Sequence, residues 1–239
     1  MHPVFSTTFS STSFAFGFLF IALFAVPTAA QDQERSTKTI LDLPVDGGFK
    51  DEIEEIAPEV VVFYGQMFEC QGIFYCLDRS SSTCDGELEI EKREAIRNVR
   101  EFSQDMEFAF VFFDRGIRKF PSNGKPVRAT PGHKQQAITC LSTLRCGAGT
   151  CVRQALLETM TYVNACNVRR AVVIYLGDGQ TTCPGSDPDQ HALATLRDVR
   201  AANKRNVPID AIHVGRDSVN NLSRPLADMN DGRLTVITR

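Results

Sequence analysis

Three kinds of pattern are missing from this sequence, and each absence argues against a class of protein. No two cysteines form a Cys-x-x-Cys pair, and no cysteine–histidine spacing suits a structural zinc site. No block or stripe is rich in lysine and arginine, and the net charge is −3, so we do not expect nucleic-acid binding. No Gly-x-Ser-x-Gly segment is present and no histidine is placed as a base, which argues against a serine hydrolase.

Charge is also missing from the start of the chain. Residues 3–31 contain no acidic or basic side chain, and the segment 14–26 is strongly apolar. Small residues follow at Thr28 and Ala30, so we predict that residues 1–30 are a secretory signal peptide. The alternative is an N-terminal membrane anchor, because the uncharged stretch reaches spanning length when it is extended back to the chain start. Both interpretations predict a secreted, periplasmic or envelope-associated protein.

The rest of the chain has enough apolar sequence for one domain. Of all 239 residues, 43% are hydrophobic, which supports a core of ordinary size. Residues 31–58 are polar and acidic and contain proline and glycine, so we predict a linker or arm there. The predicted domain occupies residues 59–239.

The eight cysteines are an even number. In an oxidising compartment this number favours disulfides, although the sequence alone does not choose among the many pairings. Cys76 lies inside a predicted strand, where a buried free thiol and a disulfide are equally open.

Short apolar runs alternate with amphipathic segments through the predicted domain. Runs rich in β-branched and aromatic residues predict strands at 60–65, 72–77, 108–113, 171–179, 209–215 and 233–238, with a short edge strand at 115–120. Apolar residues at helical spacing predict helices at 87–102, 134–144, 152–163, 189–206 and 219–229. This alternation predicts an α/β fold with a doubly wound, mostly parallel sheet that is flanked by helices.

Three polar clusters occur where these elements meet their loops. Asp78 and the serines at 80–82 follow one strand, Thr150 precedes a helix, and Asp178 stands between glycines at the end of another strand. In such sheets ligands bind beyond the carboxyl ends of the strands, so we expect the clusters to lie at one edge. They offer carboxylate and hydroxyl oxygens without histidine or thiolate, and these donors suit a hard divalent cation such as Mg²⁺.

The segment DRSSS at 78–82 resembles the D-x-S-x-S motif of the von Willebrand factor type A domain family. Thr150, within GAGT, is similar to the single threonine of that family, and Asp178, within YLGDG, is similar to its aspartate after a buried strand. The three elements occur in the family's order. The resemblance covers about residues 59 to 239, which is most of the predicted mature chain.

The resemblance implies a non-enzymatic binding domain with a metal-ion-dependent adhesion site. Ser80, Ser82 and Thr150 would bind the metal directly, while Asp78 and Asp178 would act mainly through bound waters and by balancing charge. The metal would be Mg²⁺ or Mn²⁺. An acidic side chain of a protein or peptide partner would complete the coordination, because mostly neutral direct ligands leave the cation able to attract a carboxylate from outside.

Three positions differ from the usual pattern of the family. Gly177 stands where threonine is frequent, Thr83 where methionine is frequent, and Ala148 where glycine is usual. None of these differences removes a predicted ligand, so we expect metal binding to be retained.

Some of the cysteines lie within a few residues of the predicted site loops. We therefore expect at least one disulfide to tie these loops together. The four cysteines concerned are Cys84, Cys146, Cys151 and Cys183.

Two other interpretations of the site remain. The serines at 80–82 could cap the next helix on a degenerate scaffold that binds no metal. Asp78 and Asp178 with Mg²⁺ could instead belong to a phosphatase of the haloacid dehalogenase type. That chemistry uses a second acid two residues after the nucleophile, where Ser80 stands, and no lysine is suitably placed. For Arg79 we expect a solvent-exposed position at the rim of the site.

Overall fold

The computed structural model describes residues 57–84, 86–215 and 221–238. All of them belong to one compact unit, Asp51–Arg239. The predicted signal peptide and nearly all of the predicted arm lie outside the described residues.

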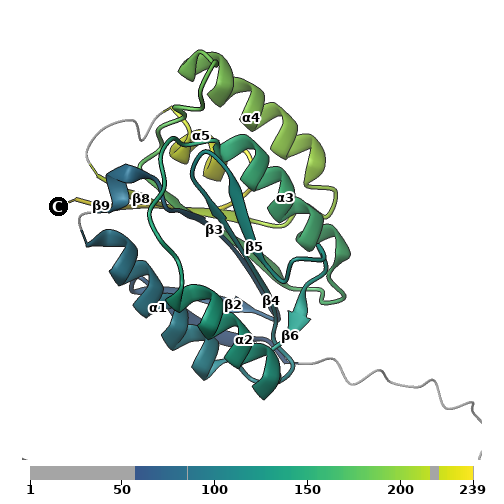
Figure 1. Ribbon diagram of the computed structural model, residues 1–239. Helices are drawn as coiled ribbons and strands as arrows, with labels where there is room; N and C mark the ends of the chain where they lie inside the picture. Colours follow the sequence, from purple (N-terminus) through teal and green to yellow (C-terminus); the bar gives the residue numbers. More distant parts are fainter. Residues whose placement is uncertain (1–56, 85, 216–220, 239) are drawn as a thin grey trace, which may run out of the picture. The chain divides into compact units, whose positions relative to one another are not determined.

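A seven-stranded sheet, in the order β5-β4-β3-β7-β8-β9 with β6 beside β4, runs through the described residues (Figure 1). Parallel neighbours are β3 (Gly72–Asp78), β4 (Glu107–Phe113), β7 (Ala171–Gly177), β8 (Ile209–Val214) and β9 (Leu234–Ile237). The short strands β5 (Ile117–Phe120) and β6 (Val127–Arg128) run antiparallel to β4. A separate antiparallel hairpin contains β1 (Glu59–Phe63) and β2 (Gln66–Cys70). The predicted α/β fold with a mostly parallel sheet is confirmed.

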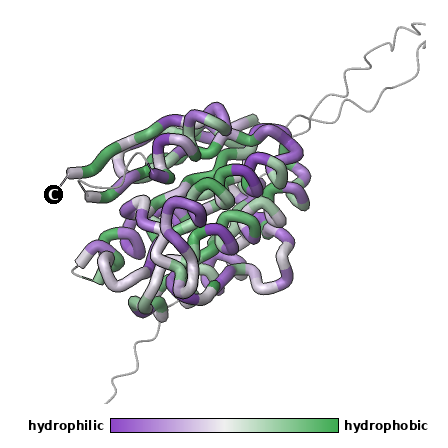
Figure 2. The backbone as a smooth tube through the Cα atoms, turned by 90° about the horizontal axis from the view of Figure 1, so that it is seen from above, coloured by the Kyte–Doolittle hydropathy of each residue, from purple (hydrophilic) through white to green (hydrophobic). Residues whose placement is uncertain are grey.

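Helices cover both faces of the sheet. They are α1 (Glu87–Glu101), α2 (Pro131–Ser142), α3 (Val152–Ala165), α4 (Pro188–Ala202) and α5 (Ser223–Asp228). One apolar cluster packs α3, α4 and α5 on one face, and a second packs α1, α2 and the β1–β2 hairpin on the other (Figure 1). In Figure 2 hydrophobic residues gather in the inner strands, and hydrophilic residues occupy the outer turns of the helices. No helix among the described residues combines the length and apolarity that a membrane crossing requires.

The central strand β3 is buried along its whole length. Its side chains alternate between the two apolar clusters, with Phe74 and Cys76 on the α3 face and Tyr75 on the α1 face. The buried Tyr75 hydroxyl accepts a hydrogen bond of 3.0 Å from Asn98 Nδ2 of α1. A strand covered on both faces reads as a continuous apolar run, which explains why the sequence predicted it well.

Elements that are only half buried were predicted less well. The strand β2 was missed, because the strand predicted at 60–65 includes the two turn residues between β1 and β2, and only five residues remain for β2. Tyr64 and Gly65 both have positive φ angles (50° and 73°), as a tight hairpin turn requires. Helix α2 begins three residues earlier than predicted, at Pro131, where the Thr130 side chain accepts a hydrogen bond from the His133 amide.

The replacement Gly232→Ala should destabilise the protein strongly. A Cβ at this position would overlap the backbone carbonyl of Ile209, and backbone cannot move aside as a flexible side chain can. We expect the free energy of unfolding in urea to fall by about 3 kcal/mol. The matched control is Gly132→Ala in α2, where a Cβ meets nothing within 4 Å. The control should leave stability unchanged or raise it by up to about 1 kcal/mol. Equal stabilities of the two variants would contradict this packing argument.

Candidate metal centre

The three predicted motifs meet at the carboxyl edge of the sheet. Asp78 is the last residue of β3, and Asp178 directly follows β7. These two strands are parallel neighbours, with Leu77 opposite Leu176, so their ends lie side by side. Thr150 stands just before α3, which packs against β3 and β4. The expectation that residues far apart in sequence gather at one edge is confirmed.

The loop after β3 folds back so that its serine hydroxyls face Asp178. The Ser80 amide donates to Asp78 Oδ1 at 2.7 Å, and the Thr83 hydroxyl donates to the Ser80 carbonyl at 2.8 Å. The Ser80 and Ser82 hydroxyls lie 2.9 Å apart, and Ser82 donates to Asp178 Oδ2 at 2.8 Å. Because the only proton of the Ser82 hydroxyl points to Asp178, the Ser80 hydroxyl must donate to Ser82.

Thr150 reaches the same cluster through the loop after β7. Its hydroxyl oxygen accepts a hydrogen bond of 3.2 Å from Thr182, four residues after Asp178. The hydrogen bonds of the described residues thus join Ser80, Ser82 and Asp178 to one another, and join Thr150 to Thr182 instead. Thr182 was not predicted as a site residue, since nothing in the sequence distinguishes it from an ordinary loop threonine.

Two disulfides link the three loops in pairs. Cys84–Cys146 joins the loop after β3 to the loop before α3, and Cys151–Cys183 joins the loop before α3 to the loop after β7. The expectation of at least one such disulfide is confirmed. Cys76, for which a free thiol and a disulfide were equally open, is a free and fully buried thiol.

Arg79 does not occupy the exposed position that we expected. Its side chain is only 18% exposed and forms an ion pair of 3.1 Å with Asp114. It also donates to the carbonyl of Arg145 at 2.9 Å, so it connects three segments. Gly147 lies so close to the Asp114 carboxylate that a Cβ would overlap it, and its amide donates to the Arg79 carbonyl at 2.8 Å. The sequence offered a signal for Asp114, because it directly follows the buried strand β4 as Asp178 follows β7.

Asp78 is the most strongly perturbed acid of the cluster. Its side chain is fully buried, and burial raises the pKa of its carboxyl group to about 7. The Ser80 amide opposes this rise in the pKa, while the negative charges of Asp178 and Asp114 add to it. Asp78 Oδ2 has no hydrogen-bond partner among the described residues. A cation beside this oxygen would compensate its charge.

Tyr175 explains the glycine at position 177. A Cβ on Gly177 would lie 2.8 Å from the Tyr175 hydroxyl and 3.3 Å from Asp78 Cβ, so the tyrosine occupies the space that a threonine would need. The Tyr175 ring is fully buried, and burial together with the charges of Asp78 and Asp178 raises its pKa well above the usual range. The hydroxyl therefore stays neutral beside the two carboxylates.

The donor set fits a hard cation. Its polar atoms are the hydroxyl and carboxylate oxygens of the residues predicted as ligands, and Mg²⁺ and Mn²⁺ prefer such oxygens. The described parts of the chain contain no group of three or more His, Cys, Asp or Glu side chains that could hold a metal ion. Of the five predicted ligand residues, only Asp78 and Asp178 are carboxylates, and the other three offer hydroxyls.

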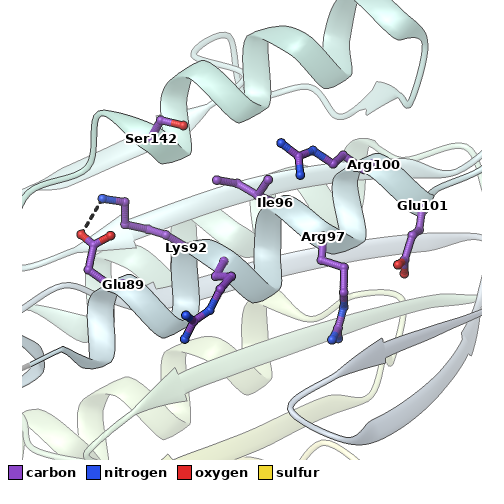
Figure 3. Close-up of a pocket in the computed structure, with 8 residues that line it drawn as sticks. Glu89, Lys92, Ile96, Arg97, Arg100, Glu101 and Ser142 are labelled. Carbon is purple, nitrogen blue, oxygen red and sulfur yellow. Dashed lines mark hydrogen bonds and ion pairs between the residues drawn. The ribbon is translucent and has the colours of Figure 1, made fainter.

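A groove between α1 and α2 lies apart from this oxygen cluster. Its volume is about 740 Å³, and it is lined by residues of α1 together with Ser142 of α2 (Figure 3). Lys92 there pairs with Glu89 at 2.7 Å, while Arg97 and Arg100 point in different directions. The groove contains none of the predicted ligand residues, and its cations do not converge on one point.

No protein-family model and no curated protein sequence matches the chain. The chain does match solved structures. A von Willebrand factor type A protein from Catenulispora acidiphila has 20% identity over 70% of this chain and 38% of its own, with a TM-score of 0.60. The pilus adhesin SpaC from Lactobacillus rhamnosus GG has 14% identity over 70% of this chain and 27% of its own, with a TM-score of 0.56. Proximal thread matrix protein 1 from the mussel byssus, with a zinc-occupied MIDAS (metal-ion-dependent adhesion site) motif, has 19% identity over 76% of this chain and 45% of its own, with a TM-score of 0.50.

The match spans less than half the length of each of these proteins. At such identities the comparison concerns the fold alone. The chain has the von Willebrand factor type A fold, as the resemblance of its motifs implied.

Removing the Cys151–Cys183 disulfide should destabilise the protein. The crosslink joins positions 32 residues apart and limits the unfolded chain, so we expect the double variant Cys151→Ala, Cys183→Ala to lose about 2–4 kcal/mol of unfolding free energy. Urea denaturation without reductant measures this loss. The control is Cys140→Ala, a free and half-buried cysteine in α2, which should change stability far less. A double variant as stable as the control would show that the crosslink constrains nothing.

The replacement Asp78→Asn should stabilise the metal-free protein in a pH-dependent way. The folded-state pKa of Asp78 is raised to about 7, above the usual carboxyl value near 4. Its contribution to stability is therefore full below about pH 4 and is lost as the pH rises to about 7. Asn keeps the shape and does not titrate, so the advantage of the variant should grow over this range and then level off. Urea unfolding in EDTA at several pH values measures it, with exposed Asp189→Asn as control. A constant difference across the range would contradict the shifted pKa.

Proposed function

We propose that this protein is a non-enzymatic binding domain that recognises an acidic side chain of a protein or peptide partner through a divalent cation, Mg²⁺ or Mn²⁺. The observation that carries the proposal is the hydroxyl chain Ser80–Ser82–Asp178, which lies beside a buried carboxylate oxygen of Asp78 that has no hydrogen-bond partner in the described residues. These oxygens come from the end of β3 with its following loop and from the loop after β7, which are 96 residues apart at Ser82 and Asp178.

The five residues divide into two roles in this proposal. Ser80, Ser82 and Thr150 supply neutral oxygens that bind the cation directly. Asp78 and Asp178 balance its charge mainly through waters, and Asp78 is held by the Ser80 amide for this task. The bound cation would supply a positive centre with a coordination position left for a partner's carboxylate. Because its direct ligands are neutral, most of its charge remains available to that carboxylate.

Two of the solved structures support this class of function. The mussel protein carries a zinc-occupied MIDAS motif, and SpaC is a pilus adhesin. Each of these descriptions applies to that protein, and the shared fold makes the same class of function a reasonable proposal here. For the ion in this chain we propose Mg²⁺ or Mn²⁺, because the donor set contains only oxygen atoms, which these ions prefer.

We also propose a secreted, periplasmic or envelope-associated location. The predicted signal peptide supports it, and so do the two disulfides, which persist in oxidising compartments. Membrane attachment would depend on residues 1–30 remaining as an uncleaved anchor.

Mn²⁺ binding to the full chain is the direct test of the site. Electron paramagnetic resonance measures the free Mn²⁺ that remains in a titration, and we expect it to show one saturable binding site. The variant Thr150→Val should lower the Mn²⁺ affinity at least about tenfold, because valine keeps the shape of threonine and loses the hydroxyl. The matched control Thr161→Val removes an exposed hydroxyl of α3 that bonds only its own helix, and it should bind normally. Asp178→Asn should also weaken binding, and competition with Mg²⁺ and Zn²⁺ ranks the ions.

Two results would overturn the proposal in different ways. Absence of saturable Mn²⁺ binding to the wild-type protein would favour a scaffold without a metal. Saturable turnover of a generic phosphate ester with Mg²⁺, lost in Asp78→Asn, would favour the phosphatase.

A further inference from the structure

A second groove adjoins the proposed metal site. Its volume is about 530 Å³, within the range of sites that hold small molecules or side chains. Its apolar lining comes from the Cys151–Cys183 disulfide, Leu157 and Pro184, and its polar lining includes Arg115 and His191.

The groove and the proposed metal site are adjacent in the chain. Cys151 and Cys183 line it, and each directly follows one of the two hydrogen-bonded threonines, Thr150 and Thr182. Consecutive Cα atoms are only about 3.8 Å apart, so one residue step leads from the predicted ligand to the groove.

Gly149, next to Thr150, lies close to two residues that line the groove. Gly149 has φ +80°, and a Cβ there would lie 3.5 Å from Arg115 Cβ and 3.7 Å from Pro184 Cδ. The loop that carries Thr150 therefore packs directly against residues of the groove. A partner that reached a cation at Thr150 would therefore also lie close to the groove.

The basic side chains around the groove differ in whether they are free to bind a ligand. Arg153 is engaged, because its Nε donates to Asp198 Oδ2 at 2.8 Å. Burial and the nearby Arg153 charge lower the pKa of His191, which keeps the imidazole neutral at pH 7. Arg115 is exposed, and no hydrogen bond or ion pair of its guanidinium occurs within the described residues. Among these groups, Arg115 is the cation that remains for a ligand.

We propose that this groove is a second subsite of the same binding face. It takes an apolar side chain directly next to the partner's metal-bound acidic residue, and Arg115 holds a further carboxylate of the partner. The partner is thus a peptide segment that combines an apolar residue with two acidic ones. This inference rests on the proposed function, since the metal fixes the first carboxylate. The two are tested separately by measuring Mn²⁺ binding and peptide binding.

The test uses short peptides as probes of the full chain in Mg²⁺. Saturation-transfer NMR titrations compare acetylated Gly-Gly-Asp-Gly-Gly with peptides in which leucine precedes or follows the aspartate. One leucine peptide should bind at least about tenfold more tightly than the glycine peptide, as burial of an apolar side chain predicts. Leu157→Gln should remove this gain, whereas Leu193→Gln, an exposed leucine of α4, should not.

The charged contact has its own pair of variants. A glutamate placed beyond the favourable leucine should tighten binding further, and Arg115→Gln should remove that second gain. The control Arg93→Gln changes an exposed residue of α1, on the other face of the sheet, and should retain the gain. Mn²⁺ binding should be unchanged in all four variants.

The outcomes separate the two proposals. If the glycine peptide binds in a Mg²⁺-dependent way but leucine adds nothing, or Leu157→Gln keeps the gain, the groove proposal is overturned and the metal-dependent function stands. If no peptide binds in a Mg²⁺-dependent way and Mn²⁺ does not bind, both are overturned. If Mn²⁺ binds without Mg²⁺-dependent peptide binding, the groove proposal is overturned.

Discussion

The arrangement of loops at this edge of the sheet depends on one buried carboxylate at the end of the central strand. Asp78 ends β3, which has a parallel strand on either side and helices over both faces. A buried ionised carboxylate is unfavourable unless hydrogen bonds or a cation compensate it. The Ser80 amide compensates one of its oxygens. In the proposed site the cation would compensate the other oxygen, Asp78 Oδ2. The carboxylate that destabilises the metal-free fold is therefore the one that would favour metal binding.

The surrounding loops must be held together against electrostatic repulsion. Asp78 ends β3, while Asp114 and Asp178 directly follow β4 and β7, so the three acids lie at the carboxyl ends of neighbouring strands. Besides burial, the negative charges of Asp114 and Asp178 raise the pKa of Asp78. Arg79 forms an ion pair with Asp114, and it donates a hydrogen bond to the Arg145 carbonyl in the segment before α3. The two disulfides hold these loops covalently. Loops already fixed in place lose little conformational freedom when a cation binds, and this favours affinity.

The sequence predicted the features that follow from strand burial and missed those that depend on loop paths. Fully buried strands such as β3 and β7 are continuous apolar runs, and the parallel order of their ends brought Asp78 and Asp178 together as expected. The half-buried strand β2 and the two-residue strand β6 lack such a signal. The pairing of four nearby cysteines and the burial of Arg79 beside Asp114 depend on how loops cross, which periodicity does not encode.

A metal ion by itself discriminates poorly among partners, because any accessible carboxylate can approach it. Specificity has to come from surfaces that lie beside the ion and differ between partners. In the proposed scheme the Cys151–Cys183 disulfide would occupy that position, because Cys151 directly follows Thr150 and both cysteines line the neighbouring groove. The crosslink that joins two of the candidate site loops would thus also fix the distance between a bound ion and the apolar surface. In the proposed scheme that fixed distance selects a partner by the residue next to its acid rather than by the acid alone.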